Sequence, residues 1–238
     1  MFRAGCHRMF AAVAARQPVC LGPVFHTSRS AARHCSNTSP QSCWSCDDTI
    51  DAEGFFCGCE KNVVLPVNPK RDYFSILGCT RSFTLDSAEL QKSFRRLQTQ
   101  LHPDKFSNQP QQAQTYSADQ SSLVNNAFQT LSSPLSRGLY MLQLGNMAVE
   151  DGTTSTDQTF LMHVMDLNDS LDAIESEQDL TEFLPEVQEL IESCTGKAAA
   201  AFEQENLEVA REQICQLKYF VNLERRAKDK LLAADIAS

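Results

Sequence analysis

The sequence predicts an all-α protein: a helical hairpin with flanking short helices, then a three-helix bundle, both preceded by a small Cys-rich metal-binding segment. From residue 71 onward, apolar side chains recur at helical spacing in segments that end at glycine or proline. Residues 146–238 carry a net charge of −13 and still keep apolar stripes with the helical period. Four cysteines cluster within residues 43–59, ahead of the first predicted helix.

The overall composition is that of an ordinary globular chain. Of the 238 residues, 42% are hydrophobic and 21% are charged, which excludes wholesale disorder. No run of about 18 apolar residues occurs, so no transmembrane helix is predicted. The net charge is −9, concentrated in the C-terminal half. This acidity argues against nucleic acid as the main partner, because phosphate binding requires clustered Lys and Arg.

Residues 1–36 have the composition of a mitochondrial transit peptide. They are rich in Arg, Ala and Ser and contain no Asp or Glu. The apolar stretch FAAVAA is shorter than the core of a secretory signal. The alternative is a tail with no targeting role. We expect cleavage within VFHTSRSAARH and a location in the mitochondrial matrix, with the cytoplasm as a second location.

The clustered cysteines form two short pairs, Cys43-x-x-Cys46 and Cys57-x-Cys59. A reducing compartment favours metal binding over disulfides, and four thiolates build a tetrahedral structural zinc site with no open position for catalytic water. The second pair is one residue shorter than the usual C-x-x-C loop, so free or redox-linked thiols remain the alternative. Residues 40–66 are therefore predicted to be a zinc module covered by the apolar side chains of Trp44, Phe55 and Phe56.

Residues 71–145 are predicted to form four short helices. The segment RDYFSILG forms a helix that ends at Gly78, and Asp86 with Glu89 resembles a capping box. Pro103 and Pro134 end the second and third helices. The second helix has an apolar stripe of four residues: Leu90, Phe94, Leu97 and Leu101.

The tripeptide His102-Pro103-Asp104 falls in the loop between two amphipathic helices, directly after a basic helix face that carries Arg95 and Arg96. Two other interpretations of His102 are open. It could be a helix-end histidine stabilised by the helix dipole, or a catalytic base, although no Ser or Cys nucleophile is obviously paired with it. Taken alone, the basic residues would be a solvated face.

The segments DYFSILG, LQKSFRRLQTQLHPDKF, LVNNAFQTL and PLSRGLYML resemble the J-domain, by which co-chaperones engage seventy-kilodalton heat-shock chaperones. The resemblance spans residues 71–145. It implies that the His-Pro-Asp loop and the basic helix before it dock on the chaperone and stimulate its ATP hydrolysis, with no ATP bound by this chain. The chaperone-binding residues that it implies are His102, Pro103, Asp104, Arg95, Arg96 and Lys105.

Residues 157–232 are predicted to form the three-helix bundle, with helices over about 157–176, 179–203 and 207–231. Pro185 either delays the start of the second helix or bends it. On the first helix, three apolar residues fall outside the core stripe, which indicates either a partner surface or a helix buried on two sides. These residues are Leu161, Met162 and Met165, and on the third helix Tyr219 is expected almost opposite the core stripe.

A J-domain followed by an acidic three-helix bundle, with a Cys-rich segment and a leader ahead of it, resembles the HscB-type co-chaperones of iron–sulfur cluster biogenesis. The Gly/Phe-rich linker or zinc repeats of general J-proteins are absent after the J-domain. The resemblance implies a non-enzymatic protein whose bundle binds the IscU-type scaffold, and whose chaperone partner then promotes cluster transfer to recipient proteins. It implies six scaffold-binding residues: Leu161, Met162, Met165, Asp166, Asp169 and Tyr219. The alternatives are a general mitochondrial J-protein for folding or import, and a zinc-dependent thiol enzyme.

Overall fold

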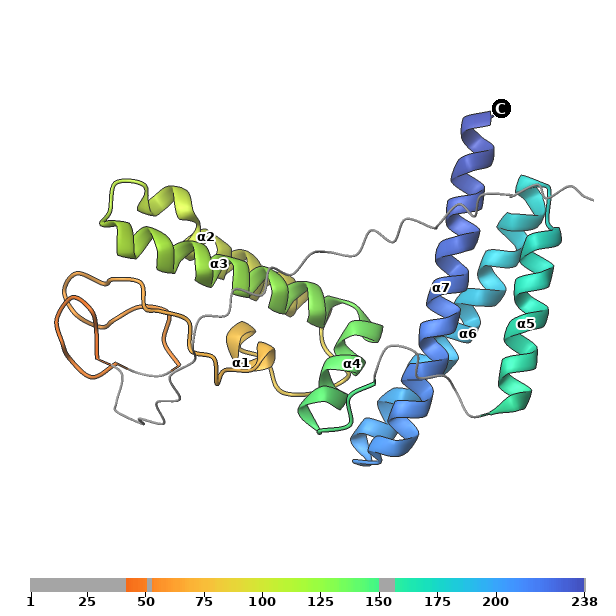
Figure 1. The fold of residues 1–238 in the computed structure, drawn as a ribbon, viewed down its shortest axis with the longest axis horizontal. Helices are drawn as coiled ribbons and strands as arrows, with labels where there is room; N and C mark the ends of the chain where they lie inside the picture. The colour runs from red at the N-terminus through yellow and green to blue at the C-terminus, as the bar shows by residue number, and fades with distance from the viewer. Residues whose placement is uncertain (1–41, 51–52, 150–156, 238) are drawn as a thin grey trace, which may run out of the picture. The chain divides into compact units, whose positions relative to one another are not determined.

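The computed structural model describes residues 42–50, 53–149 and 157–237, with side chains up to residue 233 (Figure 1). The predicted leader, residues 1–36, lies outside the described residues. Within the described part, the chain folds into seven α-helices and one 3-10 helix, so the all-α prediction is confirmed. None of the described helices is both long enough and apolar enough to cross a bilayer.

The first two helices, α1 (Tyr73–Leu77) and α2 (Ser87–Leu101), both begin after aspartates, and the start of α2 at Asp86 confirms the prediction. Asp72 caps α1 and Asp86 caps α2, each by accepting hydrogen bonds from backbone N–H groups of the first turn. Gly78 ends α1 with a φ of 69°, in the left-handed region that favours glycine. Local hydrogen bonds therefore set these helix ends.

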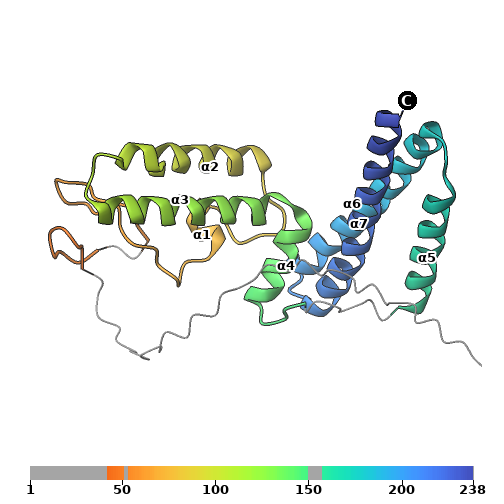
Figure 2. The same ribbon diagram turned by 45° about the horizontal axis from the view of Figure 1, so that its top comes forward.

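Helices α2 and α3 (Gln111–Ser132) lie antiparallel and side by side, and α1 packs beneath α3 (Figure 1, Figure 2). The 3-10 helix η1 (Pro103–Phe106) lies in the connection between them. Phe94 is only half-buried and stacks on Phe128, with ring centroids 4.2 Å apart. The buried core of this hairpin consists of Val64, Phe74, Ile76, Leu77, Leu90, Leu97, Leu101, Val124, Ala127 and Leu131.

Helix α4 (Pro134–Leu144) packs against the C-terminal bundle rather than against the hairpin alone. A Cβ atom at Gly138 would lie 2.3 Å from the Cδ1 atom of Ile214, so only glycine fits this approach without a shift. Beside it, the rings of Phe83 and Phe202 stack with centroids 5.1 Å apart. The hairpin and the bundle therefore share a packed apolar seam.

The bundle consists of α5 (Gln158–Ala173), α6 (Glu177–Glu203) and α7 (Leu207–Ala237) (Figure 1). Ser176 caps α6, and Pro185 lies inside that helix, so it does not delay the start. Two of the free cysteines, at positions 194 and 215, are small buried core residues. The other buried bundle residues are Val164, Leu167, Leu171, Leu180, Phe183, Val187, Ala198, Ala201, Ala210, Ile214, Leu217, Phe220, Leu223 and Ala227.

Polar contacts from α7 hold the C-terminal turn of α5. Arg226 donates hydrogen bonds to Asn168 and to the carboxylate of Asp172, the latter over 2.7 Å. The Nζ atom of Lys230 donates to the backbone carbonyl of Leu171 over 2.8 Å. Positive charge near these terminal carbonyls also complements the helix dipole, so both cations stabilise the end of α5.

Candidate functional site

The His-Pro-Asp loop is exposed, as predicted, and its backbone is firmly held. His102 ends α2 and begins η1, and the backbone N–H of Asp104 donates to its Nδ1 atom over 3.3 Å. The side chains of His102 and Asp104 are 55% and 89% exposed. One residue earlier, the carbonyl of the buried Leu101 accepts a 2.7 Å hydrogen bond from the Ser117 hydroxyl. The motif thus projects into solvent from a fixed position.

The predicted basic residues lie next to this loop. Arg95 and Arg96 are exposed on α2, within two turns of its end, and Lys105 is exposed on η1. Along residues 90–105, Lys92, Arg95, Arg96 and Lys105 outnumber the single acidic residue, Asp104. The loop and the helix face before it therefore carry a net positive charge.

The bundle presents a second exposed face, on α5. Met162 and Met165 are 67% and 65% exposed, which is unusual for large apolar side chains. Asp166 and Asp169 are exposed as well. The four residues follow the i, i+3, i+4, i+7 spacing of a single helix face, so the structure brings them together. We call this set the α5 face.

The other two predicted scaffold residues lie at the margin of the core. Leu161 is half-buried, and Tyr219 packs edge-on against Phe160 with ring centroids 5.7 Å apart. The prediction that Tyr219 lies almost opposite the core stripe is therefore wrong. Its neighbour Phe220 contacts the same Phe160 ring, with centroids 5.5 Å apart, so α5 packs on α7 at both positions. A helical wheel drawn for one helix does not contain contacts with a second helix.

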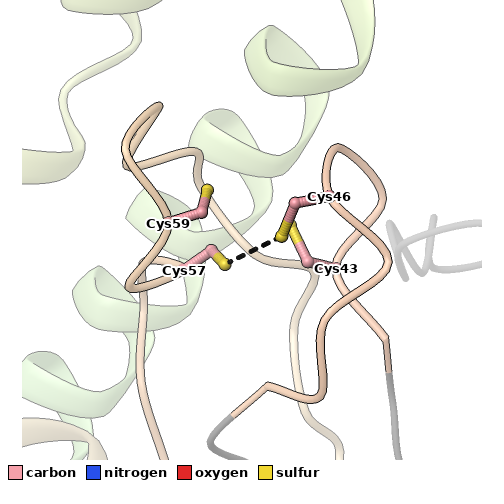
Figure 3. A group of neighbouring side chains, drawn as sticks. All are labelled: Cys43, Cys46, Cys57 and Cys59. Carbon is pink, nitrogen blue, oxygen red and sulfur yellow. Dashed lines mark hydrogen bonds between the residues drawn. The ribbon is translucent and has the colours of Figure 1, made fainter.

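The four predicted metal ligands converge (Figure 3). Their Sγ atoms all lie within 4.8 Å of one another, and those of Cys46 and Cys57 are 3.7 Å apart. A tetrahedral zinc site with bonds of about 2.3 Å places its sulfur atoms about 3.8 Å apart, so the group fits such an ion closely. The short Cys57-x-Cys59 loop still brings both of its thiols into the group. Four close thiols of this kind could bind a metal ion.

The thiols perturb one another. At Cys59, burial raises the pKa, but hydrogen bonds from the Cys57 side chain and from the Lys61 backbone outweigh it and lower the pKa to about 7. At Cys46, the Asp48 backbone lowers the pKa, but burial and the neighbouring side chains reverse this and raise it well above its ordinary value. Closely spaced thiols cannot all ionise together without a cation. A bound metal ion supplies that charge.

The predicted apolar cover of the cysteines is wrong in part. The Trp44 indole donates to the Val64 carbonyl over 2.8 Å and meets the Tyr116 ring edge-on at 6.3 Å. Phe55 and Phe56 pack against the core of the helical hairpin. These aromatic side chains therefore pack the Cys-rich segment against α3 and the core of the helical hairpin. The thiols are instead packed by Ile50, Val63 and Leu65.

Sequence reasoning missed the buried polar residues of α3. Ser117 is fully buried and holds the end of α2, while Gln120, 2% exposed, donates to the carbonyls of Leu65 and Pro66 over 3.0 and 3.1 Å. Burying such polar side chains costs free energy unless they form hydrogen bonds. Polar residues at inward positions of a helical stripe are the signal that could have found them.

Two family models match the chain. The DnaJ domain model matches residues 72–140, and the model described as the HSCB C-terminal oligomerisation domain matches residues 156–228. Together they cover the helical part of the chain in the order in which the structure shows it.

Individual relatives agree with the family models. The chain is 37% identical to the mouse iron-sulfur cluster co-chaperone protein HscB over 194 residues, 80% of this chain and 82% of the relative. It is 37% identical to the human HscB protein over 207 residues, 85% and 87% of the two chains. The crystal structure of human co-chaperone protein HscB superposes with a TM-score of 0.75 and 36% identity, over 80% of this chain and 98% of the other. The chain therefore belongs to the HscB family of iron–sulfur cluster co-chaperones.

Proposed function

We propose that this protein binds an IscU-type scaffold through its bundle, delivers it to a mitochondrial seventy-kilodalton heat-shock chaperone and stimulates that chaperone's ATPase. One observation carries the proposal: a single chain presents two exposed candidate sites on different helices, the His-Pro-Asp loop and the α5 face. Two separate sites allow the chain to hold chaperone and scaffold at the same time. ATP hydrolysis in the chaperone then promotes cluster transfer to recipient proteins.

On the chaperone side, the His-Pro-Asp loop makes the specific contact. Arg95, Arg96 and Lys105 surround it with positive charge, which steers an acidic partner surface and speeds association. The ATP site belongs to the partner, and this chain acts by binding. Exposed charges of this kind are screened by salt, so chaperone binding weakens as ionic strength rises.

On the scaffold side, the α5 face combines flexible apolar anchors with acids. Methionine adapts to irregular surfaces, and an exposed Met pair flanked by Asp166 and Asp169 suits an apolar patch bordered by basic residues. Leu161 and Tyr219 extend this surface at its buried margin. We propose that all six residues contact the scaffold.

The domain organisation follows the same proposal. Residues 1–36 act as a mitochondrial transit peptide, supported by their basic, acid-free composition, and direct the protein to the matrix. Residues 40–66 form the metal module, residues 71–145 the J-domain and residues 157–232 the scaffold-binding bundle. The chain is not an enzyme in this proposal, as expected of a co-chaperone.

The proposed metal is one structural zinc ion held by Cys43, Cys46, Cys57 and Cys59. Four thiolate ligands close the coordination sphere, so a zinc ion here cross-links the two Cys loops and supplies no catalytic chemistry. Metal analysis of the purified protein should give about one zinc per chain. Removal with a chelator should release four titratable thiols and leave the helical circular dichroism unchanged. Metal-free protein with four free thiols, purified without chelator, would contradict this assignment.

Substitution of His102 tests the chaperone assignment. His102→Gln should change the free energy of unfolding by no more than about 0.5 kcal/mol, because the side chain is exposed and its main contact is one weak hydrogen bond. The same variant should abolish stimulation of the chaperone ATPase while still retaining the scaffold in a pull-down. Normal stimulation by the folded variant would refute the J-domain assignment. Failure of the wild-type protein to retain the scaffold would favour a general J-protein.

A further inference from the structure

A small hairpin carries the second pair of cysteines. Phe56 and Val64 form an antiparallel bridge, and the Cys57 N–H donates to the carbonyl of residue 63 over 2.9 Å. The backbone N–H of Asn62, whose φ is 43°, donates to the Cys59 carbonyl over 2.9 Å. This turn fixes the backbone of residues 61 and 62 directly beside the proposed metal ligands. We call residues 56–64 the Cys hairpin.

Two hollows lie between the Cys hairpin and the segment that follows the His-Pro-Asp motif. The smaller, of about 330 Å³, is lined by Phe56, Asn62, Gln100, Lys105 and Phe106. The larger, of about 470 Å³, is lined in part by Trp44, Lys61, Asn62, Phe106, Gln109 and Pro110. Asn62 and Phe106 line both hollows, so the two adjoin. The surface next to the motif is therefore built jointly by the Cys hairpin and η1.

The Cys hairpin is fixed to the helical hairpin rather than tethered beside it. Val64 is fully buried in the core that contains the last residue of α2, Leu101. The carbonyl of Val64 accepts the Trp44 hydrogen bond, and the carbonyl of Leu65 accepts one from Gln120 on α3. These contacts hold the Cys hairpin in one position relative to α3, which also holds the start of the His-Pro-Asp loop.

The linings of the two hollows carry positive charge. Lys61 and Lys105 are both exposed, each lines one of the hollows, and neither hollow has an Asp or Glu in its lining. This holds although residues 47–69 carry four more acids than bases. The lysines have the same sign as the basic face of α2. An acidic or polar partner surface therefore fits the hollows and the helix face together.

We propose that the Cys hairpin extends the chaperone-binding surface, with Lys61 and Asn62 contacting the same acidic surface of the seventy-kilodalton chaperone that receives the His-Pro-Asp loop. The proposal rests on the proposed function. It also gives the metal module a role, because the Cys57-x-Cys59 loop positions Lys61 and Asn62. Continuity with the His-Pro-Asp surface identifies the occupant, because Lys105 belongs to both.

A charge reversal at Lys61, with a matched reversal elsewhere, tests this surface. Lys70 is the control, because it is exposed, lies in the connection between the Cys hairpin and α1, and lines neither hollow. Lys61→Glu should weaken binding of the full chain to the chaperone about tenfold, since it sets like charges against each other, and Lys70→Glu should change it less than about twofold. Equal affinities for the two variants would overturn the proposal.

Two further measurements keep the outcomes separate. The zinc content and melting temperature of Lys61→Glu should match those of the wild type, which shows that the Cys hairpin is intact. ATPase stimulation by His102→Gln, measured with the same chaperone, reports on the proposed function itself. If His102→Gln loses stimulation and Lys61→Glu equals the Lys70→Glu control, the further inference fails alone. If His102→Gln stimulates normally, the chaperone assignment fails as well.

Trp44 offers an independent probe, because it is the only tryptophan in the chain and lines the larger hollow. Protein labelled with 5-fluorotryptophan should give a single fluorine resonance. Addition of unlabelled chaperone should shift that resonance in the wild type, and should shift it less at the same chaperone concentration in Lys61→Glu. An unchanged chemical shift at saturating chaperone would contradict contact at the Cys hairpin.

Discussion

The His-Pro-Asp loop and the α5 face differ in how each relates to the hydrophobic core. The side chains of His102 and Asp104 are exposed, while buried groups such as Ser117 hold only the backbone next to them. On the bundle, Met162 is exposed, but Tyr219 at the edge of the same surface packs on Phe160. Under the proposed function, different groups carry binding and stability in the first region. In the second region, the Tyr219 side chain would serve both.

The physical reason is the kind of element that carries each site. A 3-10 connection between two helix ends has no face that must be buried, so its side chains are free to project. Helix α5 must bury one face to stay folded, and residues at the margin of that face contact both core and solvent. Substitutions on the bundle therefore need a stability control that the loop does not.

The largest expected effect separates the two kinds of residue on the bundle. Met162→Ala combined with Met165→Ala should reduce scaffold affinity about thirtyfold and leave the melting temperature unchanged, because both side chains are exposed. Tyr219→Ala should lower the free energy of unfolding by about 2 kcal/mol, since it removes ring packing against Phe160. Calorimetric melting and a scaffold binding titration measure the two quantities.

Tyr219→Phe is the matched control, because it keeps the ring and removes only the hydroxyl. It should melt like the wild type. If Tyr219→Ala also melted like the wild type, the side chain would be a pure surface residue and the contrast between the two regions would disappear.

A smaller effect concerns the packed apolar seam between the helical hairpin and the C-terminal bundle. Gly138→Ala should destabilise the protein by about 1–2 kcal/mol, because the clash with Ile214 outweighs a gain of about 1 kcal/mol in helix propensity. Gly196→Ala, on α6, meets no atom within 4 Å and should stabilise it by about 0.5–1 kcal/mol. Denaturant unfolding measures both changes.

Adding Ile214→Val to Gly138→Ala removes the Cδ1 atom that clashes, so the double variant should recover part of the loss. Equal stabilisation by both glycine substitutions would mean that the seam is loosely packed. The helical hairpin and the bundle would then be less tightly joined than the packing indicates.

The smallest expected effect concerns the anchoring of α5. Arg226→Gln with Lys230→Gln should lower the free energy of unfolding by about 0.5–1 kcal/mol, because these contacts are partly exposed and screened by solvent. Hydrogen exchange should accelerate in the last turn of α5. Arg225→Gln, which breaks a pair with Asp229 inside α7, should leave exchange in α5 unchanged. Equal exchange in all variants would show that apolar packing alone holds the helix.

Local signals explain why most helix ends were predictable. The caps at Asp86 and Gly78 depend on hydrogen bonds and backbone angles within four or five residues, and Pro103 ends α2 by its own covalent geometry. The apolar period of α2 and α5 likewise marks the buried side of each helix without reference to any other segment.

The sequence by itself determined the helices, the exposed His-Pro-Asp loop and the identity of the four clustered cysteines, because each depends on residues close together in the chain. Only the tertiary structure decided that Tyr219 contacts Phe160, that Trp44 packs on α3 and that the Cys hairpin lies beside η1. These contacts join segments far apart in sequence. Helical periodicity predicts which side of a helix faces inward, but the point where another segment crosses it depends on packing between both surfaces.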